Sequence, residues 1–286
     1  MRAVDQSPET LSGDLKIAEI GEDVMADQYV QLQWVEPGIA LLTITREKSL
    51  NALNSEVLDQ LEASLNVVED SPEARVVIVT GQGQKAFVAG ADIAAINQAP
   101  DLEHAHHFAE RGQKLFHRFQ TSRVLSIAAI NGYALGGGME LALALDMRIA
   151  AESARLGQPE INLGIIPGFG GTQRLARLVG SGRALWMIAS GEPVLAGDAL
   201  TMGLVDGVVP LDSLMEECLR RARILAKQAP LALVESKRMV VGSRDWEVRT
   251  GLDAEAEAFA RMVVSKDGRE GTRAFLEKRA PEFRGD

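Results

Sequence analysis

Cysteine is nearly absent from this chain, because Cys218 is the one thiol among 286 residues. No internal disulfide can form, which is typical of a protein that works in a reducing compartment, and we expect the cytoplasm. The flanking residues, MEECLRRA, have a helical pattern. We therefore interpret Cys218 as a buried or inert thiol and not as a nucleophile.

Long apolar runs are absent as well, and no stretch reaches the length that a membrane span requires. The N-terminal residues contain no continuous apolar segment, and their six acidic side chains argue against a secretory signal or a transit peptide. We interpret residues 1–26 as a mobile arm or a weak additional helix. The sequence thus predicts a protein without a membrane partner.

An excess of positive charge is also lacking, since the formal net charge is −10. This balance disfavours nucleic acid or an anionic membrane surface as a partner of the whole molecule, but it allows a small anionic ligand held by local cations. Three histidines cluster in EHAHHFAE, and His104 and His107 can share one helix face. No cysteine or aspartate pattern accompanies them, so we predict a solvated helix and no metal site.

The order of the predicted elements favours an α/β fold. A hairpin is expected at Pro37-Gly38, and a helix is expected to begin at Asn54 or Ser55 and to end before Pro72. Short apolar runs such as ARVVIVTG and SIAAING are typical of strands covered on both faces. Because strands and helices alternate, we predict an α/β core with partly parallel sheets over residues 27–210.

The pattern changes after this core. Residues 211–286 are predicted to form successive helices with no strand between them. A helical region of this size would bury little apolar surface alone. We therefore expect it to dock on the core or on a neighbouring subunit.

Glycine is frequent, and its placement is specific. GYALGGGMELAL puts Gly136, Gly137 and Gly138 where a predicted strand meets a predicted helix, and AGAD ends another strand with small residues. Backbone N–H groups at such turns lack an intrahelical acceptor and are open to a ligand. Two turns of this kind can direct two donors at one oxygen, and one such donor is worth about 2.7–4 kcal/mol in a transition state. The alternative is that the glycines only permit close packing, but two separate clusters favour a functional role.

Two glutamates lie in apolar surroundings. Glu140 falls in the first turn of the helix after the glycines, where burial would raise its pKa toward the range used in proton transfer. The alternative for Glu140 is a capping role. Glu160 lies in LGQPEINLGII, whose apolar residues predict a buried loop. Two carboxylates beside one oxyanion hole can hold a water between a base and an acid, but their spacing leaves open whether they meet.

Two further motifs have simpler explanations. The glycine run YALGGGME lacks the G-x-G-x-x-G spacing of a dinucleotide site, and no acidic partner for a ribose is apparent. GFGGTQRL predicts a helix that starts near Gly170 or Gly171. Its arginines, Arg174 and Arg177, are compatible with a phosphate site, but we interpret them as part of a solvated helix face.

Together these motifs resemble the enoyl-CoA hydratase/isomerase family, the crotonases. The resemblance covers residues 28–286 and rests on AFVAGADI, on AAINGYALGGGMELALALDMRIAAESARLGQPEINLGIIPGFGGTQRL and on EGTRAFLEKRAPEF. It implies a spiral of ββα turns with a C-terminal α-helical trimerisation region, assembled as a homo-trimer or as a homo-hexamer made of two trimers. It also implies reversible hydration of 2-trans-enoyl-CoA to 3-hydroxyacyl-CoA in fatty-acid metabolism, with no cofactor, since CoA is part of the substrate.

The resemblance assigns roles to particular positions. The N–H groups of Ala91 and Gly137 would form the oxyanion hole for the thioester oxygen. Glu140 would help to activate the water that adds at C3, and Glu160 would deliver a proton to C2, directly or through the water. The other positions implied to contact substrate are Gly168 near the water, Ala89, Gly90 and Asp92 in the loop that holds the adenine of CoA, and Phe275 and Lys278, which would reach CoA from a neighbouring subunit.

The sequence departs from the family pattern at two places. Ala94 stands where many hydratases have a lysine that contacts a CoA phosphate, and Arg46 or Lys48 are candidates to replace it. Ser126 stands where a proline is common. Both glutamates are present, which favours hydration over the alternatives: a Δ3,Δ2-enoyl-CoA isomerase, a specialised acyl-CoA hydratase, or a non-catalytic RNA-binding relative, which the acidic charge disfavours.

Overall fold

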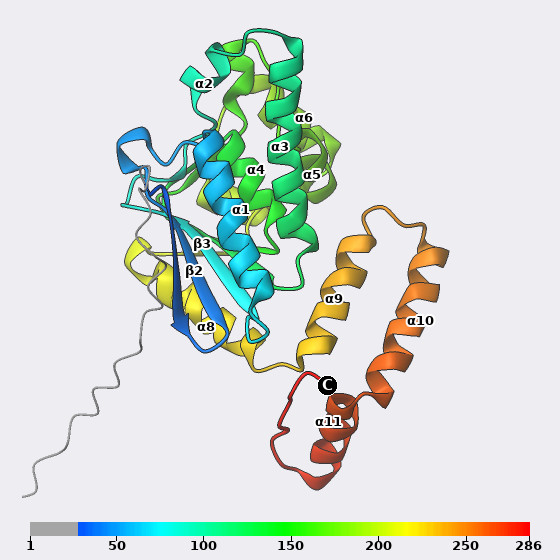
Figure 1. Ribbon diagram of the computed structural model, residues 1–286. Helices are drawn as coiled ribbons and strands as arrows, with labels where there is room; N and C mark the ends of the chain where they lie inside the picture. Colours follow the sequence, from blue (N-terminus) through cyan, green and yellow to red (C-terminus); the bar gives the residue numbers. More distant parts are fainter. Residues whose placement is uncertain (1–27) are drawn as a thin grey trace, which may run out of the picture.

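The computed structural model describes residues 28–286 (Figure 1), so the predicted arm at 1–26 lies outside the described residues. Within this range one sheet has the strand order β1-β2-β3-β5-β7-β10. The first pair is an antiparallel hairpin that turns at Pro37-Gly38, as predicted, and the other pairs are parallel. The strands of this larger sheet are β1 (Val30–Glu36), β2 (Ile39–Ile44), β3 (Val76–Gly81), β5 (Leu125–Ile130), β7 (Met147–Ala151) and β10 (Gly207–Val209).

A second, smaller sheet has the order β4-β6-β8-β9. In the chain, β3 is followed by β4, β5 by β6 and β7 by β8, and a helix follows each pair. The chain therefore advances as a spiral of ββα turns that places one strand in each sheet, which confirms the predicted fold. The strands of the smaller sheet are β4 (Ala86–Val88), β6 (Tyr133–Leu135), β8 (Arg155–Gly157) and β9 (Val194–Leu195).

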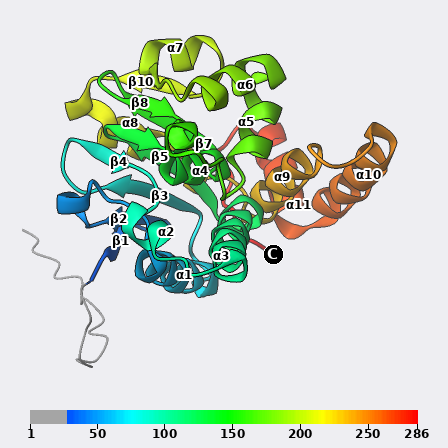
Figure 2. The same cartoon turned by 90° about the horizontal axis from the view of Figure 1, so that it is seen from above.

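Helices cover the larger sheet on both faces. On one side lie α1 (Ser55–Asp70) and α3 (Leu102–Thr121), which pack against each other. Asn54 caps α1 by accepting from the N–H of Val57, and the apolar stripe predicted for this helix is buried. On the other side α8 (Leu214–Ala226) contacts β3, β5 and β7 through Leu214, Cys218 and Ala222 (Figure 2).

Cys218 is buried in this second layer, and burial raises the pKa of its thiol to about 12. A thiol with so high a pKa is almost entirely protonated at neutral pH, which makes it a poor nucleophile. The interpretation of Cys218 as a buried, inert thiol is confirmed.

Shorter helices link the two sheets and carry the turns that matter below. One of them, α4, is buried along its whole length, because it passes between the smaller sheet and α3. None of the helices among residues 28–286 has both the length and the apolarity to cross a membrane. The connecting helices are α2 (Ile93–Asn97), α4 (Gly137–Ala144), the 3-10 helix η2 (Pro159–Leu163), α5 (Gly171–Val179), α6 (Ser181–Ser190) and α7 (Ala196–Thr201).

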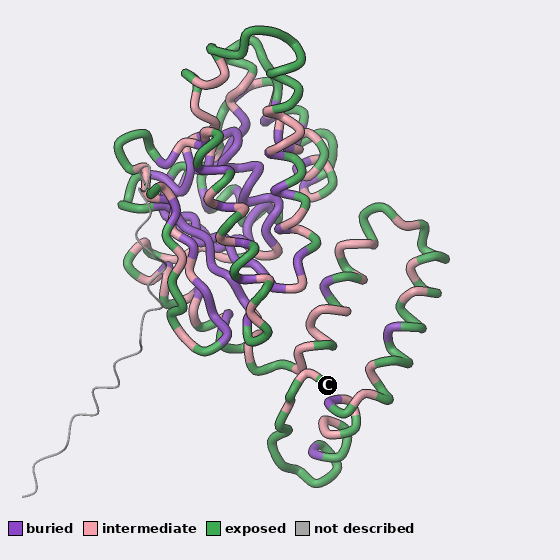
Figure 3. Tube along the Cα trace, in the orientation of Figure 1, coloured by how far each residue is buried: buried purple, intermediate pink, exposed green. Residues whose placement is uncertain are grey.

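The last three helices project from the core (Figures 1 and 3) and are called the arm from here on, in distinction from the N-terminal residues 1–26. They are α9 (Pro230–Gly242), α10 (Val248–Val264) and α11 (Lys266–Glu277). The arm is held to the core by Lys237 of α9, whose buried ammonium donates to the carbonyls of Phe119 and Val124 and pairs with Asp146 at 2.8 Å. The predicted succession of helices is confirmed, and most of their surface is exposed in the single chain (Figure 3).

Candidate active site

The two glycine turns meet at one edge of the smaller sheet. β4 and β6 are parallel neighbours, so their carboxyl ends lie side by side, and the turns that follow them line a cavity of about 320 Å³. The sequence-predicted residues in its wall are Ala89, Gly90, Ala91, Gly137, Glu140, Glu160 and Gly168.

Two residues that line this cavity, Ala91 and Gly137, have backbone N–H groups without an acceptor among the described residues. Ala91 forms a parallel bridge with Leu53 in which the carbonyl of Gly90 and the N–H of Asp92 pair with Leu53, so the N–H of Ala91 points to the opposite side. Gly137 is the first residue of α4, where the N–H has no intrahelical acceptor. A Cβ on Gly137 would lie 3.3 Å from the nitrogen of Ala91. The two donors are thus close enough to bind one oxygen.

The three consecutive glycines have different roles. Gly136 has φ 50° and ψ −124°, a region that L side chains rarely adopt, and a Cβ there would come within 2.8 Å of Oε1 of Glu160. A Cβ on Gly138 would lie 2.0 Å from the carbonyl oxygen of Val88. The packing alternative therefore holds for Gly138, whereas Gly136 and Gly137 border the cavity.

Glu140 is buried, and its carboxylate is anchored from one side. Oε1 accepts from the N–H groups of Phe169 at 2.8 Å and Gly171 at 2.7 Å. Burial raises the pKa of Glu140 to about 7; these two N–H groups oppose the shift, and the negative charge of Glu160 adds to it. A capping role is also present, but Glu140 caps the N-terminus of α5 and not that of its own helix.

Glu160 lies in the first turn of η2, on the other side of the cavity. Burial raises the pKa of Glu160 to about 7 as well. The charge of Glu160 acts on Glu140, so the structure brings together the two carboxylates whose meeting the sequence left open.

The expectation of a buried loop around Glu160 is wrong. Ile161, Leu163, Ile165 and Ile166 are 41%, 55%, 38% and 67% exposed. Three of them, Leu163, Ile165 and Ile166, line the cavity, so the apolar run forms its wall and not part of the core.

Gln158 is a site residue that the sequence analysis missed. Its side chain is fully buried, and with its amide nitrogen turned toward Glu160 it donates to Oε1 at 3.0 Å and Oε2 at 3.2 Å. It also lies beside Gly171, where a Cβ would meet the amide. The signal was a glutamine directly before Pro159-Glu160, in a segment otherwise predicted to be apolar and buried.

Arg174 does not lie on a solvated helix face, contrary to the expectation. Nε donates to Oε1 of Gln120 at 2.9 Å, and Nη1 donates to the carbonyl of Phe169 at 2.8 Å. Burial lowers the pKa of Arg174, and attraction by Glu140 opposes this shift. The first residue of α5, Gly171, is hydrogen-bonded to Glu140, and in this position the helix directs Arg174 toward Gln120 of α3. Arg177, one turn later, is exposed as predicted.

The remaining predicted residues lie outside this cavity. Asp92 caps α2 through the N–H of Ala94 and pairs with Arg46 at 3.1 Å, so Arg46 stands beside the loop that lacks the lysine. Phe275 and Lys278 are exposed at the end of the arm and do not line the cavity of their own chain.

The histidine cluster is exposed on the first turns of α3. Nδ1 of His104 lies 2.7 Å from Asp101, the residue that caps the helix, and His106 and His107 are also exposed. The predicted solvated helix is confirmed. In the part of the chain that the structure describes, no group of three or more His, Cys, Asp or Glu side chains is arranged to hold a metal ion.

Known proteins are similar to this chain in both sequence and fold. A family model described as enoyl-CoA hydratase/isomerase matches residues 35–286. A short-chain-enoyl-CoA hydratase of Clostridium acetobutylicum is 42% identical over 247 residues, which are 86% of this chain and 94% of the relative. A crotonyl-CoA hydratase of Syntrophomonas wolfei is 42% identical over 248 residues, or 87% of this chain and 95% of the relative. The solved structure of an enoyl-CoA hydratase from Bacillus anthracis superposes with a TM-score of 0.87 at 39% identity, covering 91% of this chain and 100% of that chain.

Proposed function

The chain belongs to the enoyl-CoA hydratase/isomerase family and is an enzyme that hydrates enoyl-CoA thioesters, and we propose how its residues carry that reaction. The substrate is a 2-trans-enoyl-CoA and the product a 3-hydroxyacyl-CoA. The observation that carries the proposal is the meeting of two unpaired N–H groups and two carboxylates of raised pKa in one cavity.

The N–H groups of Ala91 and Gly137 bind the thioester oxygen. As water adds to the double bond, electron density moves from C3 through C2 onto this oxygen, and the two donors stabilise the resulting enolate. Gly137 opens α4, so the partial positive charge of the helix N-terminus acts on the same atom. A side chain at Gly137 would occupy the space next to Ala91, which explains why glycine is required there.

The two glutamates position the water and transfer the protons that its addition requires. Oε1 of Glu140 is fixed by two N–H groups, which leaves Oε2 free to accept a hydrogen bond from the water that attacks C3. Glu160 in its protonated form supplies a proton to C2, and the proton lost by the water restores the acid–base pair. Each addition therefore places OH on C3 and H on C2. Burial raises the pKa values of both Glu140 and Glu160 to about 7, so both carboxyl groups can exchange protons near neutral pH.

Hydration is favoured over isomerisation because two acids face the cavity. Moving a double bond needs one group that takes a proton from one carbon and returns it to another, whereas adding water needs a base and an acid. The chemistry uses no cofactor, since CoA belongs to the substrate. Gly168, Ala89, Gly90 and Asp92 are proposed to border the water and the adenine end of CoA.

The assembly and the compartment belong to the same proposal. We expect a trimer or a hexamer, in which Phe275 and Lys278 of one subunit reach CoA bound to the next, because they lie far from the cavity of their own chain. A reducing, cytoplasmic location is in keeping with the buried thiol of Cys218.

The test is the loss of enoyl-thioester absorbance when the purified protein meets crotonyl-CoA, with the 3-hydroxyacyl-CoA product identified by chromatography. Glu140→Gln and Glu160→Gln keep the size of each side chain, and each should reduce turnover by on the order of 10²-fold or more, because each removes a positioned acid or base. Near wild-type hydration by either folded variant would refute the role given to that glutamate.

A further inference from the structure

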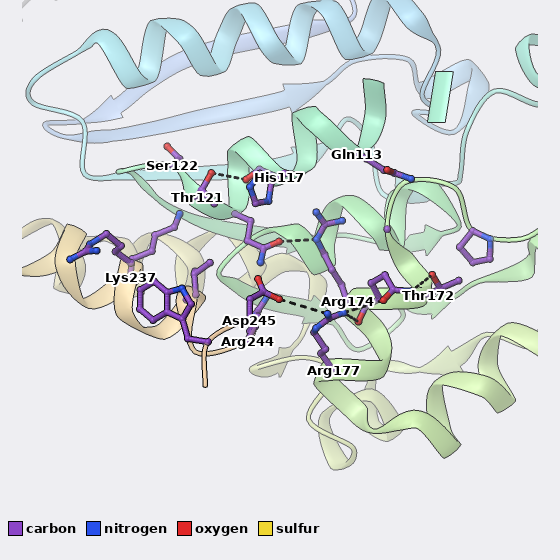
Figure 4. Close-up of a pocket in the computed structure, with 18 of the residues that line it drawn as sticks. Gln113, His117, Thr121, Ser122, Thr172, Arg174, Arg177, Lys237, Arg244 and Asp245 are labelled. Carbon is purple, nitrogen blue, oxygen red and sulfur yellow. Dashed lines mark hydrogen bonds and ion pairs between the residues drawn. The ribbon is translucent and has the colours of Figure 1, made fainter. Parts of the chain in front are cut away.

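A second, larger cavity lies directly behind the proposed active site. It has a volume of about 960 Å³, is open to solvent on one side, and is lined by residues of α3, α5, α9 and the turn that follows α9 (Figure 4). Ala109, Ile166 and Gly168 line both cavities. A Cβ on Gly168 would meet only the Cβ of Ala109, at 3.9 Å, so there is free space beside Gly168 where the two cavities share their lining.

The larger cavity is strongly cationic in a protein whose net charge is −10. Its one carboxylate is that of Asp245, and its basic lining residues are Arg123, Arg174, Arg177, Lys237, Arg238 and Arg244. Half of these charges are already satisfied elsewhere. Lys237 pairs with Asp146, Arg238 pairs with Glu235, and the guanidinium of Arg123 donates to backbone carbonyls.

The other three arginines are available to a ligand. Arg177 lies 3.7 Å from Asp245, a loose and exposed pair, and its Nη1 donates to Gln173. Among residues 28–286, no carboxylate lies within ion-pair distance of Arg174 or Arg244. Arg174 donates through Nε and Nη1 to uncharged oxygens, which leaves Nη2 for another acceptor. Arg244 is near enough to Arg174 for the two charges to repel. Such a cluster attracts an anion into the space between its members.

The remaining wall is mixed: polar side chains of α3 and α5, among them Gln113, Gln120 and Gln173, stand beside an apolar part that would suit a hydrocarbon chain. Ile166 and Pro167 continue from the active-site loop, and Val234, Val241 and Trp246 close the side formed by the arm. A ligand that fits both parts is a chain of methylene groups with an anion at its end. Figure 4 shows Arg177 of α5 facing Asp245 of the turn after α9, and Arg174 turned toward Gln120 of α3 on the same side of α5.

Building on the proposed hydration of enoyl-CoA, we propose that this cavity binds a carboxylate at the far end of the acyl group. The substrate class is then the 2-enoyl-CoA thioesters of dicarboxylic acids. The acyl chain leaves the smaller cavity past Gly168 and Ala109, and its terminal carboxylate is bound by Arg174, Arg177 and Arg244. Arginine suits this task because its planar fork of donors matches a carboxylate. A separate anionic effector is less well matched, since the cavity shares its wall with the acyl pocket.

The experiment compares two series of substrates with the whole enzyme. Straight-chain 2-enoyl-CoA thioesters of increasing length are prepared in methyl-ended and carboxylate-ended forms, and kcat/KM is measured for each. At the length that reaches the cavity, the carboxylate-ended member should be the better substrate. In Arg244→Gln and Arg177→Gln the ratio of kcat/KM between the two forms should fall about tenfold, the effect of one charge-assisted hydrogen bond.

Two further variants sharpen the test. Asp245→Asn removes the competing carboxylate of the cavity, so it should raise the preference for the carboxylate-ended substrate. Arg220→Gln removes an exposed arginine of α8, away from the cavity, and should leave the ratio as in the wild type. If the wild type prefers methyl-ended chains at every length, or if Arg244→Gln changes the ratio no more than Arg220→Gln does, the subsite is refuted.

Binding separates this proposal from the proposed reaction. Saturated acyl-CoA thioesters with the same two endings cannot be hydrated, and their affinities are measured by calorimetry. A preference for the carboxylate ending that Arg244→Gln abolishes would support the subsite even if hydration failed. Rapid hydration without any such preference in rate or affinity would leave the reaction intact and overturn the subsite.

Discussion

At the scale of single residues, the proposed chemistry depends on two carboxyl groups that share one cavity without both being ionised. Glu140 and Glu160 each have a pKa raised to about 7 by burial, and the charge of Glu160 raises that of Glu140 further. A coupled pair of this kind loses its protons in two steps that belong to the pair. Between these steps one group is a base and the other an acid, which is the state that hydration requires.

The pH dependence of activity and stability should follow from this coupling. kcat/KM should be bell-shaped with its maximum near neutral pH. Because the folded pKa of Glu140 lies above its ordinary value of 4.5, its stabilising contribution is complete below that value and is lost as the pH rises through about 7. Glu140→Gln keeps a carbonyl oxygen for Phe169 and Gly171, so its free energy of unfolding relative to wild type should rise with pH, by on the order of 3 kcal/mol at most.

Chemical denaturation of both proteins at about pH 5 and about pH 8 measures this difference. Val67→Thr, a change at a half-exposed position of α1, serves as the matched control, and its effect should not vary with pH. A constant difference between Glu140→Gln and wild type across this range would show that Glu140 ionises at its ordinary pKa.

Local pattern predicted some residues of the site and failed at others for one physical reason. Glu140 could be found because its apolar neighbours are adjacent in sequence, and the small residues at 89–91 and 136–138 mark their turns directly. Arg174 could not be placed, because Gln120 and Phe169, which hold it, come from other elements. Gln158 was missed because its contact with Glu160 depends on how the chain turns at Pro159, which the local pattern does not give.

At the scale of elements, the proposed oxyanion hole depends on the start of α4. Gly137→Ala would place a methyl group 3.3 Å from the nitrogen of Ala91 and 3.4 Å from side-chain atoms of Leu53 and Phe169. These contacts are tight but tolerable, so we expect the fold to survive and the methyl group to exclude the thioester oxygen. Activity should fall by on the order of 10²-fold or more, the loss of one oxyanion donor.

The neighbouring glycine provides the contrast. Gly138→Ala would drive a methyl group into the carbonyl of Val88, so it should lower the melting temperature sharply. Thermal unfolding and steady-state kinetics of both variants separate the two roles. Unfolding by Gly137→Ala, without a binding defect in the fraction that stays folded, would assign Gly137 to packing alone.

The elements themselves were largely predictable, but the way they share a cavity was not. The helix after Asn54, the buried strands and the glycine turns follow from periods and caps that are local to each segment. Which strands join the smaller sheet depends on pairings between distant segments, such as β4 with β6. The apolar run at 161–166 has the pattern of a buried segment, but the wall of a cavity has the same pattern, so the sequence could not distinguish the two.

At the scale of the whole molecule, the arm of α9, α10 and α11 is the feature that a single chain leaves incomplete. Val248, Leu252 and Phe259 of α10 are 80%, 56% and 70% exposed, and Phe275 and Leu276 of α11 are 82% and 80% exposed. Large apolar side chains gathered on one segment are typical of a protein interface. The sequence predicted that this region would dock on the core or on a neighbouring subunit, and its own core contacts it through Lys237 of α9 and through the loose pair of Arg177 with Asp245.

We therefore expect Phe259→Asp to dissociate the assembly. A carboxylate at the centre of a buried apolar contact cannot be paired there, which costs several kcal/mol per subunit. Analytical ultracentrifugation should find a multiple of three subunits for the wild type and a monomer for the variant. Because Phe275 and Lys278 are proposed to contact CoA in the next subunit, the monomer should also show a raised KM for crotonyl-CoA, while circular dichroism stays that of a folded chain.

Val67→Asp is the matched control, since Val67 is 46% exposed and lies on α1, which is not part of the arm. It adds the same charge outside the arm and should leave both the mass and KM unchanged. A monomeric wild type would remove the need for a partner surface, and a monomeric Phe259→Asp with an unchanged KM would show that each chain binds CoA alone. In that second case Phe275 and Lys278 would have no part in the site, and the arm would serve assembly only.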